Sequence, residues 1–359
     1  MRSLIMPLES AISITQEYND KRRKGEIKAL KTGLTQLDEN IGGFDLNTIV
    51  AIAARPSVGK STYLMMLREG LLRNNPDLEI VWLSFNLEMS TANTINRMIC
   101  RDQNISLREL TSKDKPIKKE KLDQINKDYL NNIKNLPLYF VNIPLSYDAL
   151  ISQIKSFWET TCKDNKRKIF IYDIDHIHIV NSINNEMEDK KIMKLLGELN
   201  SFKKMLETQG YNSIGFILSQ ISNDIESRER LSKPDLHYPL LKDLYYGAGL
   251  QQYCDYILAL YNPYKIHLKS YGSKQFPVLY LENGNTFIPL IYSHILKQRD
   301  GETSDNEIPM IGRLSRYTME EIPRKSFYDM LKNAVTIIDN PIISGKKIIQ
   351  SNELITAEQ

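Results

Sequence analysis

The feature that most limits what this chain can fold into is the segment Ala54-Arg55-Pro56-Ser57-Val58-Gly59-Lys60-Ser61. It follows a run of apolar residues and precedes a helical pattern. A strand, a glycine-containing loop and a helix in this order form a P-loop, whose backbone amides and helix N-terminus hold phosphate oxygens. We therefore predict that residues 54–61 bind a nucleotide, with Lys60 at its β- and γ-phosphates and the Ser61 hydroxyl on Mg²⁺. Ala54 replaces the first glycine of the usual pattern, and the alternative is a chance Gly-Lys-Ser sequence at a strand–helix turn.

Apolar runs alternate with helical patterns through most of the chain. The expected strands are Thr48–Ala53, Glu79–Phe85, Leu138–Asn142, Lys168–Asp173 and Ser213–Ser219. The expected helices are Ser61–Arg73, Thr91–Cys100, Lys118–Ile133, Tyr147–Thr160 and Glu186–Thr208. This alternation predicts an α/β fold with a mostly parallel central sheet. The closely spaced runs Tyr256–Leu260, Val278–Leu281 and Ile291–Leu296 predict antiparallel strands at its edge.

The two ends of the chain differ from this core. The pattern at Leu8–Arg22 predicts a short amphipathic helix, which is too short to be stable without a surface to pack on. We expect residues 1–31 to form a linker helix and linker, residues 32–327 the core domain, and residues 328–359 a C-terminal tail.

Composition excludes several classes of protein. The chain has 359 residues, of which 42% are hydrophobic and 25% charged, as in ordinary globular proteins. The longest apolar run, Ile49–Ala54, is too short to cross a bilayer, and the N-terminus has no signal-peptide pattern. Three widely spaced cysteines indicate a reducing compartment without a disulfide framework. We expect a cytoplasmic protein with no membrane partner, and the net charge of +3 leaves nucleic-acid binding open.

Two acidic residues at strand ends complete the predicted ATPase site. Asp173 ends an apolar strand, where an aspartate can hold Mg²⁺. Asp175 is its rival, and we expect it to point to the other face of the sheet. Glu88 follows the neighbouring strand, where a carboxylate can activate the attacking water. Taken singly, Glu88 is more readily explained as a solvated acid at a strand end, and Asp173 equally so; the catalytic interpretation of the pair depends on the P-loop beside them.

Histidines at 176 and 178 follow the same strand. Two histidines two residues apart can share a strand face and bind a metal ion. No third ligand is evident in the sequence, so packing or hydrogen bonding is the favoured interpretation.

Taken together, the motifs resemble the RecA-like motor domain of DnaB-type replicative DNA helicases, which form rings and belong to superfamily 4. The matching segments lie in family order over about Thr32 to Gly301: Thr32–Asp38, the P-loop with its alanine, Leu87-Glu88-Met89, Asp173, Leu218-Ser219-Gln220 and Lys297-Gln298-Arg299-Asp300-Gly301. The resemblance implies a RecA-like P-loop NTPase core that uses ATP and Mg²⁺.

The resemblance also implies roles for individual residues. Glu88 would be the catalytic glutamate, Asp173 the Walker-B aspartate and Arg97 a nucleotide-site arginine. Gln220 would sense the γ-phosphate and link it to the DNA loops. Arg299 would reach the next subunit's ATP as a finger, with Lys297 as its companion, whereas the alternative for this pair is a basic strand end on the surface.

The segment Asp243–Gln252 resembles the loop that lines the central channel of such rings. Its expected DNA contacts are Tyr245, Tyr246, Gly247, Ala248 and Gly249. Backbone amides at the small residues would meet DNA phosphates, and the tyrosines, which replace the arginine and the acid common in the family, would stack on bases. The alternative is a glycine-rich helix start with two core tyrosines.

Partners follow from the same resemblance. We expect a homohexamer on single-stranded and forked DNA, with primase and a helicase loader as further partners, in a bacterial cell or a phage-infected host. Only about 30 residues precede the core, so the family's N-terminal collar domain would be dispensable or supplied by another protein. The alternatives are a RecA-like recombinase or clock-type ATPase that does not unwind DNA, and a non-enzymatic ring subunit that binds ATP without turnover.

Overall fold

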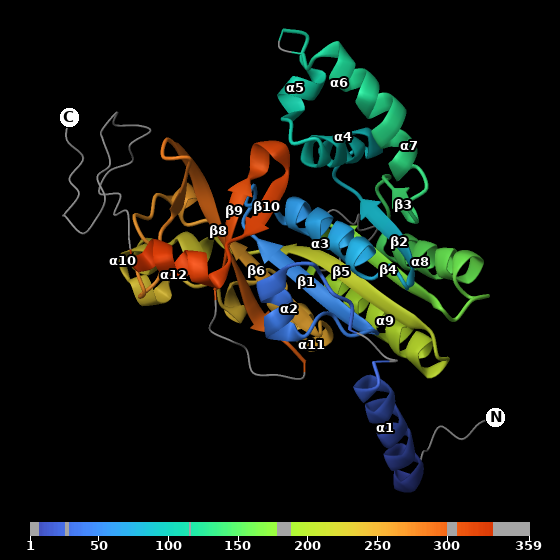
Figure 1. The fold of residues 1–359 in the computed structure, drawn as a ribbon. Coiled ribbons are helices and arrows are strands. Elements are labelled where there is room, and N and C mark those ends of the chain that lie inside the picture. The colour runs from blue at the N-terminus through green and yellow to red at the C-terminus, as the bar shows by residue number, and fades with distance from the viewer. Residues whose placement is uncertain (1–6, 26–28, 115, 178–187, 300–306, 333–359) are drawn as a thin grey trace.

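A ten-stranded sheet runs through the part of the chain that the structure describes (Figure 1). The structure is a computed structural model, and it describes residues 7–25, 29–114, 116–177, 188–299 and 307–332. The strand order is β10-β9-β8-β6-β1-β5-β4-β2-β3, and β7 pairs with β8. The strands are β1 (Thr48–Ala54), β2 (Glu79–Asn86), β3 (Leu138–Val141), β4 (Lys168–Asp175), β5 (Asn212–Gln220), β6 (Tyr256–Tyr261), β7 (Leu279–Glu282), β8 (Thr286–Lys297), β9 (Ile308–Arg313) and β10 (Thr318–Glu321).

The sheet is parallel in its centre and antiparallel on one side. Strands β3, β2, β4, β5, β1 and β6 are all parallel to their neighbours, whereas β8 runs antiparallel to β6, and β7, β9 and β10 continue that pattern. This arrangement confirms the predicted α/β sheet with its antiparallel edge. Sequence patterns did not predict β9 and β10, and they placed the end of β4 two residues too early.

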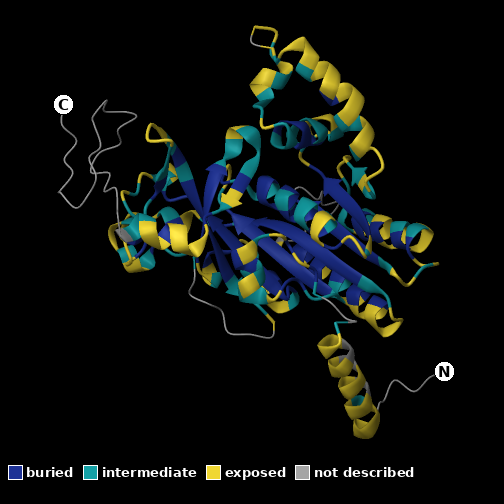
Figure 2. Cartoon of the chain, viewed as in Figure 1, coloured by how far each residue is buried: buried dark blue, intermediate teal, exposed yellow. Residues whose placement is uncertain are grey.

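Helices cover both faces of the sheet, so that the central strands are buried on both sides (Figure 2). On one face, α2 (Thr35–Ile41) and α3 (Lys60–Asn74) pack their leucines on the strands. On the other face lie α8 (Tyr147–Thr161), α9 (Glu188–Thr208) and α11 (Gly247–Tyr253). Burial on both faces explains why these strands read as continuous apolar runs rather than as alternating patterns.

The remaining helices lie at the sides of this core. A lobe beyond β3 contains α4 (Thr91–Asp102), α5 (Leu107–Thr111), α6 (Lys119–Gln124) and α7 (Leu130–Ile133), and one π-helical stretch joins the last two into the helix predicted over Lys118–Ile133 (Figure 1). Helix α10 (Arg228–Ser232) follows β5. None of the described helices combines the length and the apolar character that crossing a bilayer requires.

The ends of the core differ from the predicted boundaries. Helix α1 (Leu8–Arg23) forms as expected, with Leu8 and Ile12 exposed. Leu30, expected in the linker, is fully buried and pairs with Phe44. Helix α12 (Arg324–Lys332) crosses the boundary expected between residues 327 and 328, because Met330 and Leu331 beyond that boundary also pack against the core. Residues 333–359 of the expected tail lie outside the described residues.

We predict that Gly70→Ala lowers the free energy of unfolding by about 1–3 kcal/mol, because a rigid backbone group occupies the space of the new methyl group. A Cβ at Gly70 would lie 1.8 Å from the Thr32 carbonyl oxygen, whereas at Gly197, also inside a helix, the nearest atom is the movable Tyr253 hydroxyl at 3.3 Å. Gly197→Ala is therefore the control and should be neutral or slightly stabilising. Denaturant unfolding of both variants measures this, and equal stability losses would contradict the packing argument.

Candidate functional site

The sequence-predicted ATPase residues meet at the carboxyl edge of the parallel strands. Parallel pairing sets Ala54 beside Gln220 and Asn86 beside Asp175, so β1, β5, β2 and β4 end together. The Leu87 amide donates to the Asp175 carbonyl oxygen over 3.1 Å, which fixes the segment that carries Glu88 against the end of β4. This edge is where ligands bind in open α/β sheets.

The loop between β1 and α3 has the backbone that a phosphate cradle needs. Ser57 and Gly59 have positive φ angles of 59° and 107°, and α3 begins at Lys60 directly after them. A Cβ at Gly59 would lie 2.2 Å from Met319 and 2.8 Å from Leu314, so close packing of the β9–β10 hairpin adds to the preference for glycine that the positive φ imposes. The hairpin thus packs on Gly59, while Pro56 and Ser57 stay exposed, and Lys265 donates to the Pro56 carbonyl over 2.6 Å.

Charged side chains of the loop face the carboxylates at the strand ends. The Lys60 ammonium donates to the Ala54 carbonyl over 3.3 Å. Burial lowers the pKa of Lys60, while the carboxylates of Asp175 and Glu88 act against this shift. The Ser61 hydroxyl hydrogen-bonds to Asp175, whose pKa is raised by burial. Arg55 donates to Glu226 over 2.8 Å and so ties the loop to the segment after β5.

The structure gives the two aspartates of β4 different surroundings from those we expected. Side chains two residues apart on a strand share a face, so the expectation that Asp175 faces away from Asp173 was wrong. Asp173 is fully buried, accepts hydrogen bonds from Trp82 and Ser84, and has a pKa raised by burial to about 6. Asp175, one step further along, is the carboxylate beside Ser61 and Lys60. The metal role that we expected for Asp173 therefore fits Asp175 better.

Glu88, Asp175 and His176 form a cluster whose potential ligand atoms lie within 4.8 Å of one another. His176 Nδ1 lies 3.3 Å from the Glu88 carboxylate, and its Nε2 lies 3.4 Å from the Gln220 side-chain nitrogen. Burial lowers the pKa of His176. The histidine thus bridges two predicted catalytic residues, and the carboxylates of Glu88 and Asp175 are potential further ligands beside it that the sequence pattern did not indicate. His178 lies outside the described residues.

The expected DNA loop is joined directly to the strand that carries Gln220. The Tyr245 amide donates to the Gln220 carbonyl over 3.0 Å, and Ile221 forms a bridge with Leu244. Tyr245 and Ala248 are exposed, Tyr246 and Gly247 are half-buried, and Gly249 is buried against Leu196 of α9. A Cβ at this position would lie 3.2 Å from the Leu196 side chain, so close packing favours glycine there.

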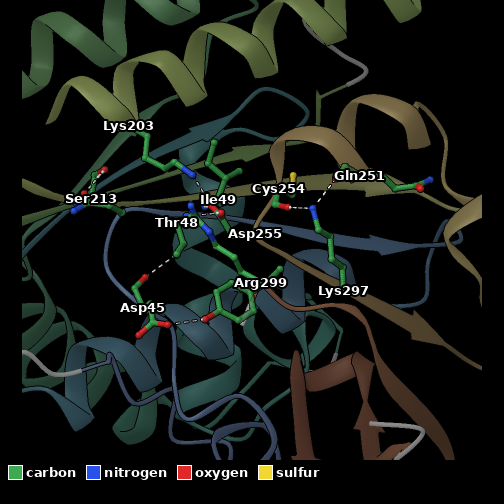
Figure 3. Close-up of polar contacts among 12 residues, drawn as sticks. Asp45, Thr48, Ile49, Lys203, Ser213, Gln251, Cys254, Asp255, Lys297 and Arg299 are labelled. Carbon is green, nitrogen blue, oxygen red and sulfur yellow. Dashed lines mark hydrogen bonds and ion pairs between the residues drawn. The ribbon is translucent and has the colours of Figure 1, made fainter. Parts of the chain in front are cut away.

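Lys297 and Arg299 lie beside Asp255 and near the start of β1 (Figure 3), at the edge of the sheet opposite the end of β1 that leads into the P-loop. Arg299 pairs over 3.0 Å with Asp255, which precedes β6 and whose carboxylate accepts from the amide of Ile49 near the start of β1. Five residue steps along β1, from Ile49 to Ala54, separate this point from the start of the P-loop by roughly 17 Å. That distance exceeds the length of an arginine side chain, so Arg299 cannot serve the nucleotide of its own subunit.

Arg97 packs over the ring of Tyr317, with its guanidinium carbon 5.0 Å from the ring centre. Tyr317 belongs to the turn between β9 and β10, the same hairpin that covers Gly59. Arg97, the predicted nucleotide-site arginine, therefore lies beside the hairpin that packs on Gly59 of the P-loop.

Comparison with known proteins identifies the family. The model of the DnaB-like helicase C-terminal domain matches residues 29–319. The chain belongs to this family. It is 25% identical over 301 residues to the replicative DNA helicase DnaB of Geobacillus stearothermophilus, covering 82% of this chain and 57% of that protein. It is 26% identical over 275 residues to DnaB of Helicobacter pylori strain 26695, covering 76% and 51%. The chain thus spans about half the length of these curated relatives.

Solved structures agree with the fold of this DnaB-like domain. A solved ATPase domain has a TM-score of 0.67 at 20% identity, covering 88% of this chain and 98% of that one. A DnaB-like replicative helicase, solved in a study of its interactions with primase, has the same score and identity, covering 89% and 68%. The predicted RecA-like fold is confirmed.

Sequence reasoning missed the partners of several residues in this DnaB-like domain. The two-residue period of β4 was the available signal for Asp175, because it places both aspartates on one face. For Asp255 and its partner Lys203 the sequence offers no signal, because the two lie 52 residues apart and only the sheet brings them together.

We predict that Asp175→Asn removes the Mg²⁺ dependence of nucleotide binding, because the carboxylate beside Ser61 is lost. Asp173→Asn is the matched control on the same strand and should keep that dependence, since Asp173 is buried beneath the site. Titration of a fluorescent nucleotide with and without Mg²⁺ measures both variants. If nucleotide binding still depended on Mg²⁺ in Asp175→Asn but not in Asp173→Asn, Asp173 and not Asp175 would be the aspartate that holds the ion.

Proposed function

We propose that this chain is the motor of a ring-forming, ATP-dependent DNA helicase that moves along single-stranded DNA and separates the duplex at a fork. The observation that carries the proposal is the hydrogen bond from the Tyr245 amide to the Gln220 carbonyl, because it joins the nucleotide edge to the expected DNA loop. The relatives named replicative DNA helicases support the same activity.

In this proposal ATP lies on the loop at residues 54–61, with Lys60 contacting its terminal phosphates. A hydroxyl and a carboxylate are oxygen donors of the kind that Mg²⁺ prefers, so Ser61 and Asp175 fit that ion. The ion would neutralise charge on the phosphate oxygens. Glu88 is 59% exposed at its side chain and is placed to take a proton from the attacking water.

Gln220 would convert the state of the nucleotide into a movement of the DNA loop. Its side chain contacts His176 at the nucleotide edge, while its backbone holds Tyr245. The Ser222 amide also donates to the Asp243 carbonyl over 2.7 Å, and Arg230 pairs with the Asp243 carboxylate over 2.6 Å. A shift of Gln220 is therefore passed to the loop as a unit, and the exposed Tyr245 is available to stack on a base.

The position of Arg299 supports a ring of identical subunits, which we propose to be a hexamer. Because Arg299 cannot reach its own P-loop, a finger role requires the nucleotide of a neighbouring subunit. Exposed Leu8 and Ile12 of α1 would pack on that neighbour. We further propose forked DNA, primase and a helicase loader as partners, and the bacterial or phage-infected cytoplasm as the location.

We expect Lys60→Ala to abolish ATP hydrolysis and its stimulation by single-stranded DNA, because the phosphates lose their cation. The assay is phosphate release by the purified chain with and without single-stranded DNA. Lys265→Ala, which loses only a contact to the Pro56 carbonyl, is the control and should retain most of the turnover. Normal DNA-stimulated turnover by Lys60→Ala would contradict the proposed site.

A further inference from the structure

We propose that Asp255, held by the buried Lys203, is the positioning residue that sets Arg299 for the nucleotide of the neighbouring subunit. This inference rests on the proposed function, since it requires Arg299 to act in trans. It assigns a purpose to a pair of buried charges that the nucleotide edge of the same subunit does not use.

The two oxygens of the Asp255 carboxylate accept hydrogen bonds from different partners (Figure 3). Its Oδ2 accepts from the Lys203 ammonium over 2.7 Å and from the Ile49 amide over 2.8 Å. Its Oδ1 accepts from Arg299 over 3.0 Å. One oxygen is thus anchored to α9 and β1, and the other faces the guanidinium. Because the anchor comes from two separate elements, the carboxylate has a fixed direction.

Burial and charge indicate that the pair serves Arg299 and not stability alone. Asp255 and Lys203 are only 7% and 5% exposed, and a buried ion pair is weak evidence for stability. Lys203 neutralises Asp255, so the three charges sum to +1 and the guanidinium keeps its attraction for phosphate. Without Lys203, Asp255 would cancel the charge of the finger.

The Arg299 side chain needs a contact that fixes its direction. Its side chain is 57% exposed, and an exposed ion pair contributes little to stability because it restricts a flexible side chain. That restriction is useful where a charge has to meet a transferring phosphoryl group in a defined geometry. The pocket beside Arg299 has a volume of about 240 Å³, and its lining has four cationic and two acidic side chains, so it favours an anionic group.

Lys297 fixes the same segment to the helix that starts at the DNA loop. Its ammonium donates to the carbonyls of Gln251 and Cys254, over 2.6 Å and 2.7 Å, at the end of α11. A cation there complements the carbonyl end of a helix. The segment 297–299 is therefore held at two points: Lys297 contacts the end of α11, and Arg299 contacts Asp255. These contacts fix the position of Arg299 relative to the DNA loop.

The test is the rate of DNA-stimulated ATP hydrolysis in four variants: Arg299→Ala, Asp255→Asn, Lys203→Met and the double variant Asp255→Asn/Arg299→Ala. We expect Asp255→Asn and Lys203→Met to lower kcat by about tenfold or more, with the KM for ATP unchanged, because the displaced finger is not part of the binding loop. If Asp255 acts only through Arg299, the double variant is no slower than Arg299→Ala.

Lys194→Met is the matched control, since Lys194 is an exposed lysine on the same helix that pairs with Asp148 instead, and it should turn over like the unaltered chain. Thermal unfolding checks that the variants fold. Asp255→Asn/Lys203→Met removes both buried charges and should be more stable than Asp255→Asn alone yet remain slow.

The inference is overturned if Asp255→Asn slows the Arg299→Ala chain by the same factor as the unaltered chain, or if it has no effect. Absent ATPase in the unaltered chain, or full activity of Arg299→Ala, would instead refute the proposed function beneath it.

Discussion

The register of the parallel strands is the constraint on which the rest of this structure depends. Because β1 pairs with β5 from Thr48 to Ala54, and β2 pairs with β4 from Glu79 to Asn86, the four strands end at one edge. Two of the site residues, Asp175 and Gln220, are the last residues of their strands. The P-loop and Glu88 come directly after the ends of β1 and β2. A shift of one residue in a strand would turn the Asp175 carboxylate to the opposite face of the sheet and away from Ser61.

Beneath that edge lies a buried polar network that supports it. Trp82 and Ser84 donate to Asp173, the Ser84 hydroxyl also lies 3.1 Å from the Asn86 side-chain oxygen, and Asn86 donates to Thr94 at the start of α4. The network links the ends of β4 and β2 to the helix that carries Arg97. These hydrogen bonds to Asp173 are needed because a buried carboxylate without hydrogen-bond partners would lower the stability of the fold. One strand thus supplies both a buried carboxylate for structure and, two residues later, a carboxylate for chemistry.

Local sequence patterns predicted those parts of the site that depend on a single segment. The P-loop and the strand that precedes Glu88 were predictable because apolar runs and the glycine-lysine-serine sequence are local signals. The two-residue period of a strand also places Asp173 and Asp175 on one face, but we expected the strand to end at Asp173, whereas β4 continues to Asp175. Local sequence patterns could not predict that Asp255 pairs with both Arg299 and Lys203. Those contacts depend on strand order and on the packing of α9, which no local pattern encodes.

We propose that ATP hydrolysis at this edge drives the separation of DNA strands. The most direct measurement is the unwinding of a forked DNA duplex by the purified chain with ATP and Mg²⁺, compared with Glu88→Gln. We expect the unaltered chain to separate the strands only with ATP, and Glu88→Gln to bind ATP but leave the fork intact. Hydrolysis stimulated by single-stranded DNA without any strand separation would contradict the helicase assignment and favour an ATPase of the recombinase type.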